Sequence, residues 1–521
     1  MMMLAQASSE PLTPLYVIGA YLVLLLGLGV ITSRLFRGTS SDYFVASRSI
    51  GPFLLLMSVF GTTMTAFALV GSTGKAYEDG IGVYGLMASS SGLVHSLVFY
   101  IVGIRLWAIG KRYGYVTQIQ FFRARFESPA LGYLLFPILV GLVVPYLLIG
   151  LLGAGATVRA ISGGMFPGVF PNGAIPSWVT GIVICGVVLF YVFLGGLRSA
   201  AWANALQTIV FMLTGIIAFT LIARALGGPA AASAKTLETR PDLLVREEHI
   251  GVLQFISYML VPLSVGMFPH LFQHWLTARS ARAFRLTVIV HPIFIAIVWV
   301  PCILIGVWAA GAGIPAPGGN VNAVLGATVG RLLHDPWMTG LLTAGILAAI
   351  MSSLDSQFVC LGTMFTSDVV VHMSRKDRFT DRQIVWMGRA FIVAVVAAVY
   401  VLTLFPSPKI FNLAVWCFSG FAGLFPLVLA SLYWRRVTTA GAFASILVMV
   451  AIWLTLFWQD IIAPSEARIA EGGDMLVFGM MPVVFILAGS ALALVIVSLM
   501  TKPPAREVVD RFMLRSVSND G

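Results

Sequence analysis

Charge is what this sequence has least of. Only 10% of its 521 residues are charged and 59% are hydrophobic, whereas soluble domains carry about 25% charged residues. This composition excludes a water-soluble fold. Because a helix that crosses a bilayer needs about 20 apolar residues, the sequence predicts an all-α polytopic membrane protein.

Cysteine is also scarce. The four cysteines, Cys185, Cys302, Cys360 and Cys417, lie inside or at the edge of apolar runs, which excludes a disulfide framework. The sequence has no Asn-x-Ser/Thr sequon, and its start, MMMLAQASSEPLTP, lacks the basic region of a cleaved signal peptide. We therefore expect an integral plasma-membrane protein of the bacterial inner membrane.

Motifs for nucleotide hydrolysis and metal-dependent hydrolysis are absent. The sequence contains neither GxxxxGK[ST] nor HExxH, and no Ser-His-Asp group can be inferred from its spacing. These absences predict that the protein is not an enzyme and does not use ATP directly. Any energy for transport would come from an ion gradient.

Thirteen apolar runs follow one another, and we expect each to form a membrane-crossing helix. They span 13–34, 52–79, 82–106, 130–160, 177–195, 200–224, 251–276, 284–311, 336–366, 385–405, 409–434, 437–458 and 476–500. Basic residues such as Lys111, Arg112 and Arg279 gather in the loops that are cytoplasmic if the N-terminus lies outside. The positive-inside rule therefore predicts an external N-terminus and a cytoplasmic C-terminus. The net charge of +11 then reflects orientation, not nucleic-acid binding.

The second and seventh runs are poor continuous helices. Glycines and threonines interrupt MSVFGTTMTAFALVGSTGKAYEDG (57–80), and two prolines and a glycine interrupt MLVPLSVGMFPHLFQHW (259–275). Breaks at corresponding positions of two halves indicate a transporter site; the alternative is ordinary packing by small residues. The two breaks predict two inverted five-helix repeats, each of which begins with a broken helix. The chain then divides into six segments: 1–51 with the first helix, 52–224 as the first repeat, 225–250 as an external loop, 251–434 as the second repeat, 435–500 with two further helices, and 501–521 as a cytoplasmic tail.

The ninth run carries a candidate cation site. Ser352 and Ser353 follow Ala349 by three and four residues, so both hydroxyls share a helix face with the Ala349 carbonyl. The broken second run could add the carbonyl oxygens of Gly61 and Met64. Uncharged oxygens suit a weakly held monovalent cation, although such serines also commonly bond back to their own helix.

These features resemble the sodium/solute symporter family over almost the whole chain. The resemblance rests on DYFVASRSIGP (42–52), VGSTGKAYEDGIGVYG (70–85), GGLRSAAWANALQ (195–207) and GILAAIMSSLDSQ (345–357). It implies the inverted-repeat fold first known from leucine transporters, Na⁺ as the coupling ion and no organic cofactor. It also implies a main Na⁺ site formed by Gly61, Met64, Ala349, Ser352 and Ser353.

Three positions depart from the family pattern. Thr63 stands where the proline branch has Asp, and Asn204 stands where many members have Asp in W-[ST]-D-x-x-Q. Asp355 occupies a position where members with a second ion site carry Ser. A carboxylate this deep in a membrane is expensive and usually functional. We therefore expect Asp355, with Ser356 and Asn204, to hold a second ion or a proton; the alternative is an Asp satisfied by helix termini and water.

The solute is less constrained. The residues expected to line its site are Thr62, Thr65, Phe67, Ala68, Met87, Ser90, Tyr258, Ser264, Trp416 and Ser419. Ala68 and Met87 stand where the galactose branch has hydroxyl-binding Gln and Glu, which argues against a sugar. The segment GMFPHLFQHWLTARS (266–280) resembles the Pro-His turn of carboxylate, pantothenate and amino-acid branches, in which we expect His270 and His274 to make structural hydrogen bonds. Lys75 could attract an anion, but Glu78 and Asp79 favour a solvated cluster instead.

The sequence thus predicts a sodium-coupled secondary active symporter that imports a small polar solute by alternating access. We expect a carboxylate-bearing solute such as a monocarboxylate, an amino acid or a pantothenate-like compound. The alternatives are a sodium/sugar or polyol symporter and an uncoupled or sensor-like relative. The expected partners are this solute and the lipid bilayer, with no nucleic acid and no obligatory protein partner.

Overall fold

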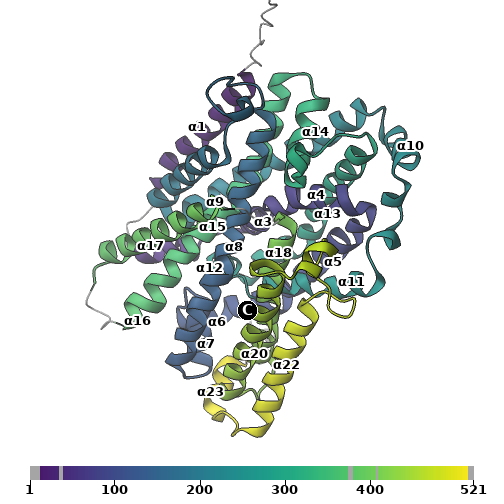
Figure 1. The fold of residues 1–521 in the computed structure, drawn as a ribbon. Helices are drawn as coiled ribbons and strands as arrows, with labels where there is room; N and C mark the ends of the chain where they lie inside the picture. The colour runs from purple at the N-terminus through teal and green to yellow at the C-terminus, as the bar shows by residue number, and fades with distance from the viewer. Residues whose placement is uncertain (1–11, 35–38, 374–378, 406–408, 514–521) are drawn as a thin grey trace, which may run out of the picture.

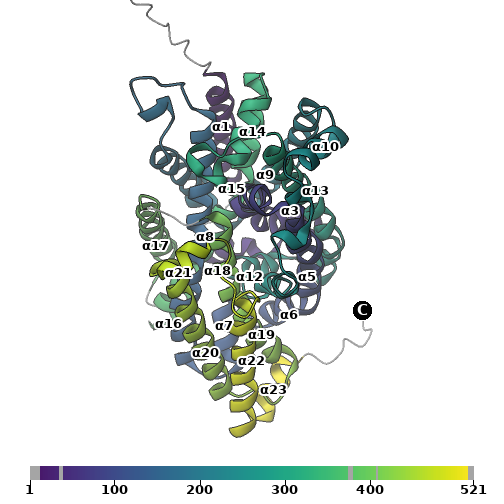
Figure 2. The same ribbon diagram turned by 45° about the vertical axis from the view of Figure 1, so that its right-hand side comes forward.

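The computed structural model describes residues 12–34, 39–373, 379–405 and 409–513. Every regular element within these ranges is helical (Figures 1 and 2). The predicted N-terminal segment and the tail 501–521 therefore lie partly outside the described residues. The all-α prediction is confirmed.

Ten helical spans are long and apolar enough to cross a membrane. They are Thr13–Ser33 (α1), Gly85–Tyr113 (η4, α5, η5 and α6), Pro129–Ile161 (α8), Ser177–Ala225 (α9), Ala281–Gly311 (η10 and α13), Pro336–Val370 (α15 and η13), Asp381–Leu402 (α17), Ile410–Tyr433 (α18 and α19), Thr439–Ile462 (α20 and η14) and Val483–Met500 (α22). Shorter helices connect them: Ser40–Val45 (α2), Gln118–Arg125 (α7), Pro229–Thr239 (α10), Val324–Leu332 (α14), Val371–Met373 (α16), Glu466–Glu471 (α21) and Arg506–Phe512 (α23).

Two further spans are broken, at the predicted places. Pro52–Thr63 (α3) and Phe67–Gly82, which comprises η2, α4 (Ser72–Asp79) and η3, meet at 58°. Val252–Gly266, which comprises α11 (Val252–Tyr258) and η9, and Pro269–Thr277 (α12) meet at 51°. The expected breaks in the second and seventh runs are therefore confirmed.

Helix α9 covers two predicted runs. At 49 residues and about 1.5 Å per residue it would be more than twice as long as a bilayer core is thick. The backbone leaves helical geometry at Gly196, where φ is 56° and ψ is −141°. If α9 is divided at this residue into two membrane spans, the ten helices and two broken spans become thirteen spans. The count of thirteen stays a prediction.

Gly196 is required at this bend. A side chain strains a backbone at positive φ, and a Cβ here would lie 2.4 Å from the Tyr43 carbonyl oxygen. We expect Gly196→Ala to destabilise the protein by about 1–3 kcal/mol and to lower the melting temperature in detergent. Gly186→Ala, on the same helix with no atom near its Cβ position, is the control and should leave the melting temperature unchanged or slightly raised. Equal melting temperatures for the two variants would contradict this account.

Two predicted boundaries were wrong. The third run, expected to end at 106, continues to Tyr113. Lys111 and Arg112 lie in its last turn, where basic side chains favour the negative end of the helix dipole, and Gly114 ends the helix at a φ of 76°. The last run, expected from 476, begins only at Val483. Pro482 precedes it, and Val477 and Met480 exchange backbone hydrogen bonds in a tight turn, so the preceding residues are not helical.

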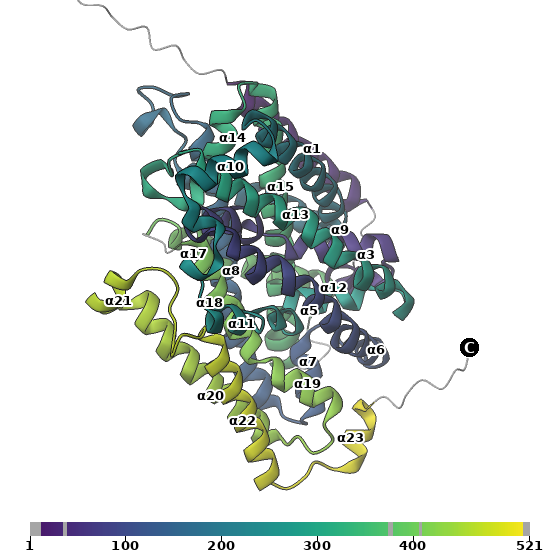
Figure 3. The ribbon, with the colours of Figure 1, turned by 90° about the vertical axis from the view of Figure 1, so that its right-hand side faces the viewer.

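The core surrounds α15. This helix is buried along most of its length and packs against α1, α3, α8, α9 and α12. Helices α20 and α22 lie side by side at the edge of the molecule and contact the rest mainly through α18 and α19 (Figures 2 and 3). In Figure 3, α21 and α23 lie at opposite ends of this pair. We call the end with α21 the Lys75 end.

Candidate functional site

The first break exposes backbone oxygens in the interior of the protein. Helix α3 ends at Thr63, and Met64 is extended with φ −86° and ψ 111°. The Thr65 hydroxyl then accepts the Phe67 amide at 3.0 Å, which starts the next helical segment. In the described part of the chain, no hydrogen bond reaches the Met64 carbonyl oxygen. This oxygen is therefore available for a ligand.

Helix α15 brings a hydroxyl to this break. The Ser352 Oγ lies 2.7 Å from the Gly61 carbonyl oxygen and 2.8 Å from the Ala349 carbonyl oxygen. Both serines and both carbonyl-bearing residues are buried. Three oxygens thus meet at this point, and the Gly61 carbonyl also accepts the Met64 amide at 3.2 Å. Uncharged oxygens gathered in this way could hold a monovalent cation.

The other two predicted ligands are near in sequence but not joined to this group by a hydrogen bond. The Ser353 hydroxyl donates to the Ile350 carbonyl at 2.9 Å, the back-bonding expected of a serine in a helix. To act as a ligand, Ser353 would have to rotate its hydroxyl. The structure therefore joins Gly61, Ala349 and Ser352 directly.

Asp355 lies one helical turn further along α15, and it is completely buried. Its Oδ2 accepts the Tyr191 hydroxyl at 3.0 Å, and its Oδ1 accepts the Ser356 hydroxyl at 3.0 Å. With its amide nitrogen turned towards Asp355, Asn204 lies 3.1 Å from both carboxylate oxygens and 2.9 Å from the Ser352 carbonyl. The predicted group of Asp355, Ser356 and Asn204 is therefore brought together.

No basic side chain pairs with Asp355 among the residues that the structure describes. The contacts are hydroxyl and amide groups, which stabilise a buried carboxylate only in part. The Asn204 contact to the Ser352 carbonyl also links this carboxylate to the first oxygen cluster. A cation or a proton would supply the missing positive charge.

The two histidines of the second break have different environments. His274 on α12 lies with Nδ1 2.7 Å from the Ser58 Oγ and Nε2 2.9 Å from the Ser356 Oγ. It therefore joins α3, α12 and α15, which confirms the expected structural hydrogen bond. His270 makes none: neither ring nitrogen has a partner within the described residues, so this expectation was wrong for His270. Its ring stacks on Phe268, with 5.2 Å between the ring centres, and lies 5.5 Å from the Tyr146 ring.

Sequence reasoning missed Tyr191 and underrated His274. Tyr191 lies in an apolar run, and no local pattern distinguishes it from a packing residue. The histidine could have been noticed as a titratable group inside a broken helix. Its two serine partners come from distant parts of the sequence, so their positions depend on the fold.

The ten predicted solute residues do not line one cavity in the described part of the protein. Trp416 and Ser419 share a small cavity near Asp460 and Asp474, and the Trp416 indole donates to Asp460 at 2.7 Å. The other eight are all buried, at the first break or on other helices: Thr62, Thr65, Phe67, Ala68, Met87, Ser90, Tyr258 and Ser264. The Thr62 and Ser419 hydroxyls are buried without a described partner, as expected of groups that receive a ligand.

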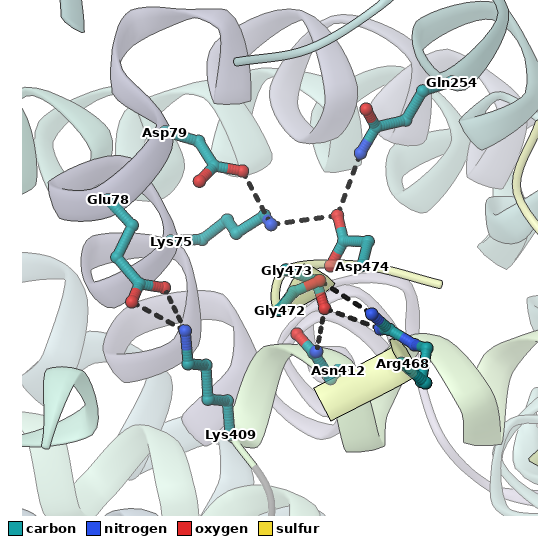
Figure 4. A network of polar contacts seen from close by, with 10 residues as sticks. All are labelled: Lys75, Glu78, Asp79, Gln254, Lys409, Asn412, Arg468, Gly472, Gly473 and Asp474. Atoms are coloured by element: carbon teal, nitrogen blue, oxygen red, sulfur yellow. Dashed lines mark hydrogen bonds and ion pairs between the residues drawn. The ribbon is translucent and has the colours of Figure 1, made fainter. Parts of the chain in front are cut away.

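A polar network closes the Lys75 end (Figure 4). The Lys75 ammonium lies 2.7 Å from Asp79 and 2.9 Å from Asp474, and Lys409 pairs with Glu78 at 2.6 Å. Lys75 is only 5% exposed, so the predicted solvated cluster is wrong. Asp474 lies against the Lys75 ammonium and helps to bury it. The sequence did not predict this contact, because Asp474 belongs to a loop almost 400 residues further along the chain.

Comparison with known proteins places these sites in a transporter fold. The model of the sodium:solute symporter family matches residues 43–448. The chain is 26% identical to the sodium/proline symporter of Escherichia coli, over 86% of this chain and 89% of that protein. It is 27% identical to the sodium/pantothenate symporter of the same organism, over 82% and 87%.

Solved structures agree on the fold. A Na⁺-coupled sialic acid symporter, solved in a substrate-bound outward-open state, has a TM-score of 0.73. The match covers 94% of this chain and 98% of that one at 17% identity. The inverted-repeat fold expected from the sequence is therefore confirmed.

Proposed function

The chain belongs to the sodium:solute symporter family, and from this premise we propose that it imports a small, carboxylate-bearing solute together with Na⁺ by alternating access. Family membership makes it an integral membrane protein that couples solute movement to sodium. The solute class, the ion sites and the orientation are the proposal. The argument depends mainly on one contact, that of the Ser352 hydroxyl with the Gly61 carbonyl at 2.7 Å.

This contact supports the main Na⁺ site because it joins a broken helix to an unbroken one. We propose that the carbonyls of Gly61, Met64 and Ala349 and the hydroxyls of Ser352 and Ser353 hold the ion. All five ligands are uncharged, so the affinity of the site would be high enough to take up the ion and low enough to release it. Because α3 and α15 both contribute, ion binding would favour one arrangement of the two helices.

Asp355 supports a second ion or a proton. We propose that its carboxylate, with Ser356 and Asn204, takes the role that an Asp at the position of Asn204 has in other members. The Asn204 amide contacts Asp355 and the Ser352 carbonyl, so it would connect the two sites. This connection would make the ions cooperate, because binding at either site would order the same segment of α15.

The gain from coupling can be estimated. One Na⁺ that crosses about 100 mV releases roughly 2.3 kcal/mol, and a tenfold gradient adds about 1.4 kcal/mol. The sum, about 3.7 kcal/mol, supports roughly 500-fold accumulation of a neutral solute. A second ion would roughly square that factor.

The proposed solute class has two supports. The relatives are named for proline and pantothenate, and both compounds carry a carboxylate. In the site, Ala68 and Met87 are apolar and fully buried, so they offer no partner to sugar hydroxyls. A sodium/sugar or polyol symporter is the second candidate, followed by an uncoupled or sensor-like relative.

Uptake into proteoliposomes tests the proposal. An inward Na⁺ gradient should drive accumulation of at least one member of a panel of radiolabelled L-proline, pantothenate, L-lactate and D-galactose. Replacing Na⁺ with K⁺ should reduce the initial rate at least about tenfold, because K⁺ is too large for a site fitted to Na⁺. Empty liposomes and the Na⁺ ionophore monensin are the controls. Equal uptake in K⁺, or in the presence of monensin, would contradict sodium coupling.

A further inference from the structure

Lys75 is a buried cation held by two carboxylates. Its ammonium is 5% exposed, while the side chains of Asp79 and Asp474 are 19% and 7% exposed. Asp79 lies one turn further along α4, so it travels with Lys75. Asp474 comes from the segment after α21, so its position relative to Lys75 depends on where that segment lies.

Several contacts hold Asp474 and its segment in place (Figure 4). The Gln254 amide donates to Asp474 at 3.0 Å. The Gly472 and Gly473 carbonyls accept from Arg468 within the same segment, at 2.7 and 2.9 Å. Both glycines have positive φ, 61° and 62°, so this part of the chain bends in a way that other residues resist. The segment 463–475 is therefore a preformed loop. It contacts the core through Asp474, through the Gly473 carbonyl, which accepts from the Asn412 amide at 3.3 Å, and through Arg468, which pairs with Asp460 at 2.6 Å.

Lys75 lies close to the first break. Its ammonium is 5.2 Å from the centre of the Phe411 ring. The Phe411 ring is in turn 5.3 Å from that of Phe67, the residue at which the broken helix resumes. The rings of Phe411 and Phe67 thus lie in sequence between Lys75 and the first break. A solute that enters from the Lys75 end would meet Lys75 before it reaches these rings.

We propose that Lys75 is the residue that selects a carboxylate, and that Asp474 occupies the position of the solute's carboxylate while the Lys75 end is closed. This inference rests on the proposed function. When segment 463–475 moves away, Lys75 keeps Asp79 and loses Asp474, which leaves a partly unpaired cation in a site of low polarity. A carboxylate on the solute then restores the original charge balance, whereas an amide or a hydroxyl does not.

The two charge pairs at this end allow a matched comparison. Lys409 and Glu78 are also paired, but Lys409 is 44% exposed. An exposed pair contributes little because water screens it. Lys75 and Lys409 are therefore the same residue type at the same end of the protein, and they differ in burial.

Paired ligands test the inference. L-proline with L-prolinamide, and L-lactate with L-lactamide, are titrated against purified protein in NaCl, and the shift in melting temperature gives apparent dissociation constants. The wild type should bind each acid at least about tenfold more tightly than its amide. Lys75→Gln should weaken binding of the acids at least about tenfold and leave the amides within about twofold, whereas Lys409→Gln should change neither.

Asp474→Asn separates competition from structural support. Removing the internal carboxylate should strengthen binding of the acids about threefold or more, because Lys75 no longer has a competing partner. This variant also keeps the test valid if Lys75→Gln does not fold. The inference is overturned if the wild type does not prefer the acids, if Lys75→Gln retains the preference, or if Asp474→Asn weakens binding of the acids. Sodium-driven uptake by the wild type in any of these cases would leave the proposed symport intact.

Discussion

Replacing Ser352 and Ser353 together with alanine is expected to raise the Na⁺ concentration for half-maximal uptake by about 10- to 100-fold. The double variant removes two of five proposed oxygen ligands, and a hydrogen bond to a charged group contributes about 1.5–3 kcal/mol. Tenfold corresponds to about 1.4 kcal/mol, so the loss of one ligand already reaches this range. The initial rate of uptake as a function of Na⁺ concentration measures the effect.

The single variants divide this effect. Ser352 contacts Gly61 across two helices, while Ser353 bonds within its own helix. We therefore expect Ser352→Ala to account for the larger part. Ser445→Ala with Ser490→Ala is the matched control, because these buried serines pair at 2.8 Å between α20 and α22, away from the break. A similar change in Na⁺ dependence in both double variants would show that the effect is not specific to the site.

Replacing Asp355 with asparagine is expected to remove the second coupling ion. The Hill coefficient for Na⁺ should fall from about two to about one, because the substitution keeps the shape of the side chain and removes its charge. Accumulation at a fixed gradient should fall by roughly 500-fold, the factor that one ion contributes. Uptake is measured at several Na⁺ concentrations and at steady state.

Asp368→Asn is the control for this substitution. Asp368 is also a buried aspartate of the same span, but it pairs with Arg123 at 2.6 Å. Its loss should reduce stability and leave the Hill coefficient unchanged. An unchanged Hill coefficient and unchanged Na⁺ affinity in Asp355→Asn would exclude the second site. If a proton occupies that site, the Asp355 effect should appear as a lost dependence of uptake on external pH.

The fold was predictable because its signals are local. Apolar runs of about 20 residues indicate membrane-spanning helices by their composition alone. The breaks are equally local, because a run that contains Pro262, Gly266 and Pro269 cannot keep continuous helical hydrogen bonds. The two wrong boundaries show that an apolar run does not fix where a helix ends: the third run continues past 106 to Tyr113, and the last begins only after the tight turn at Val477 and Met480.

The sites were predictable in part. The spacing of Ala349, Ser352 and Ser353 is fixed by the helix, so their shared face followed from sequence. The break in the second run suggested Gly61 as a further ligand and the resemblance implied the same, but only the tertiary structure brings the Ser352 hydroxyl to the Gly61 carbonyl. The role of Tyr191 was not predictable. For His274 a structural hydrogen bond was expected, but its two serine partners were not, since they come from other helices.

Sequence alone determined that this chain lies in a bilayer, where it breaks and which oxygens share a helix face. These properties depend on composition and on the helical repeat. Only the tertiary structure decided which charges are paired and which are buried. Within the described residues, Asp355 has no basic partner, whereas Lys75 has two acidic ones. The physical reason is that burial and pairing depend on what packs against a side chain, and here the packing residues come from distant segments such as 463–475.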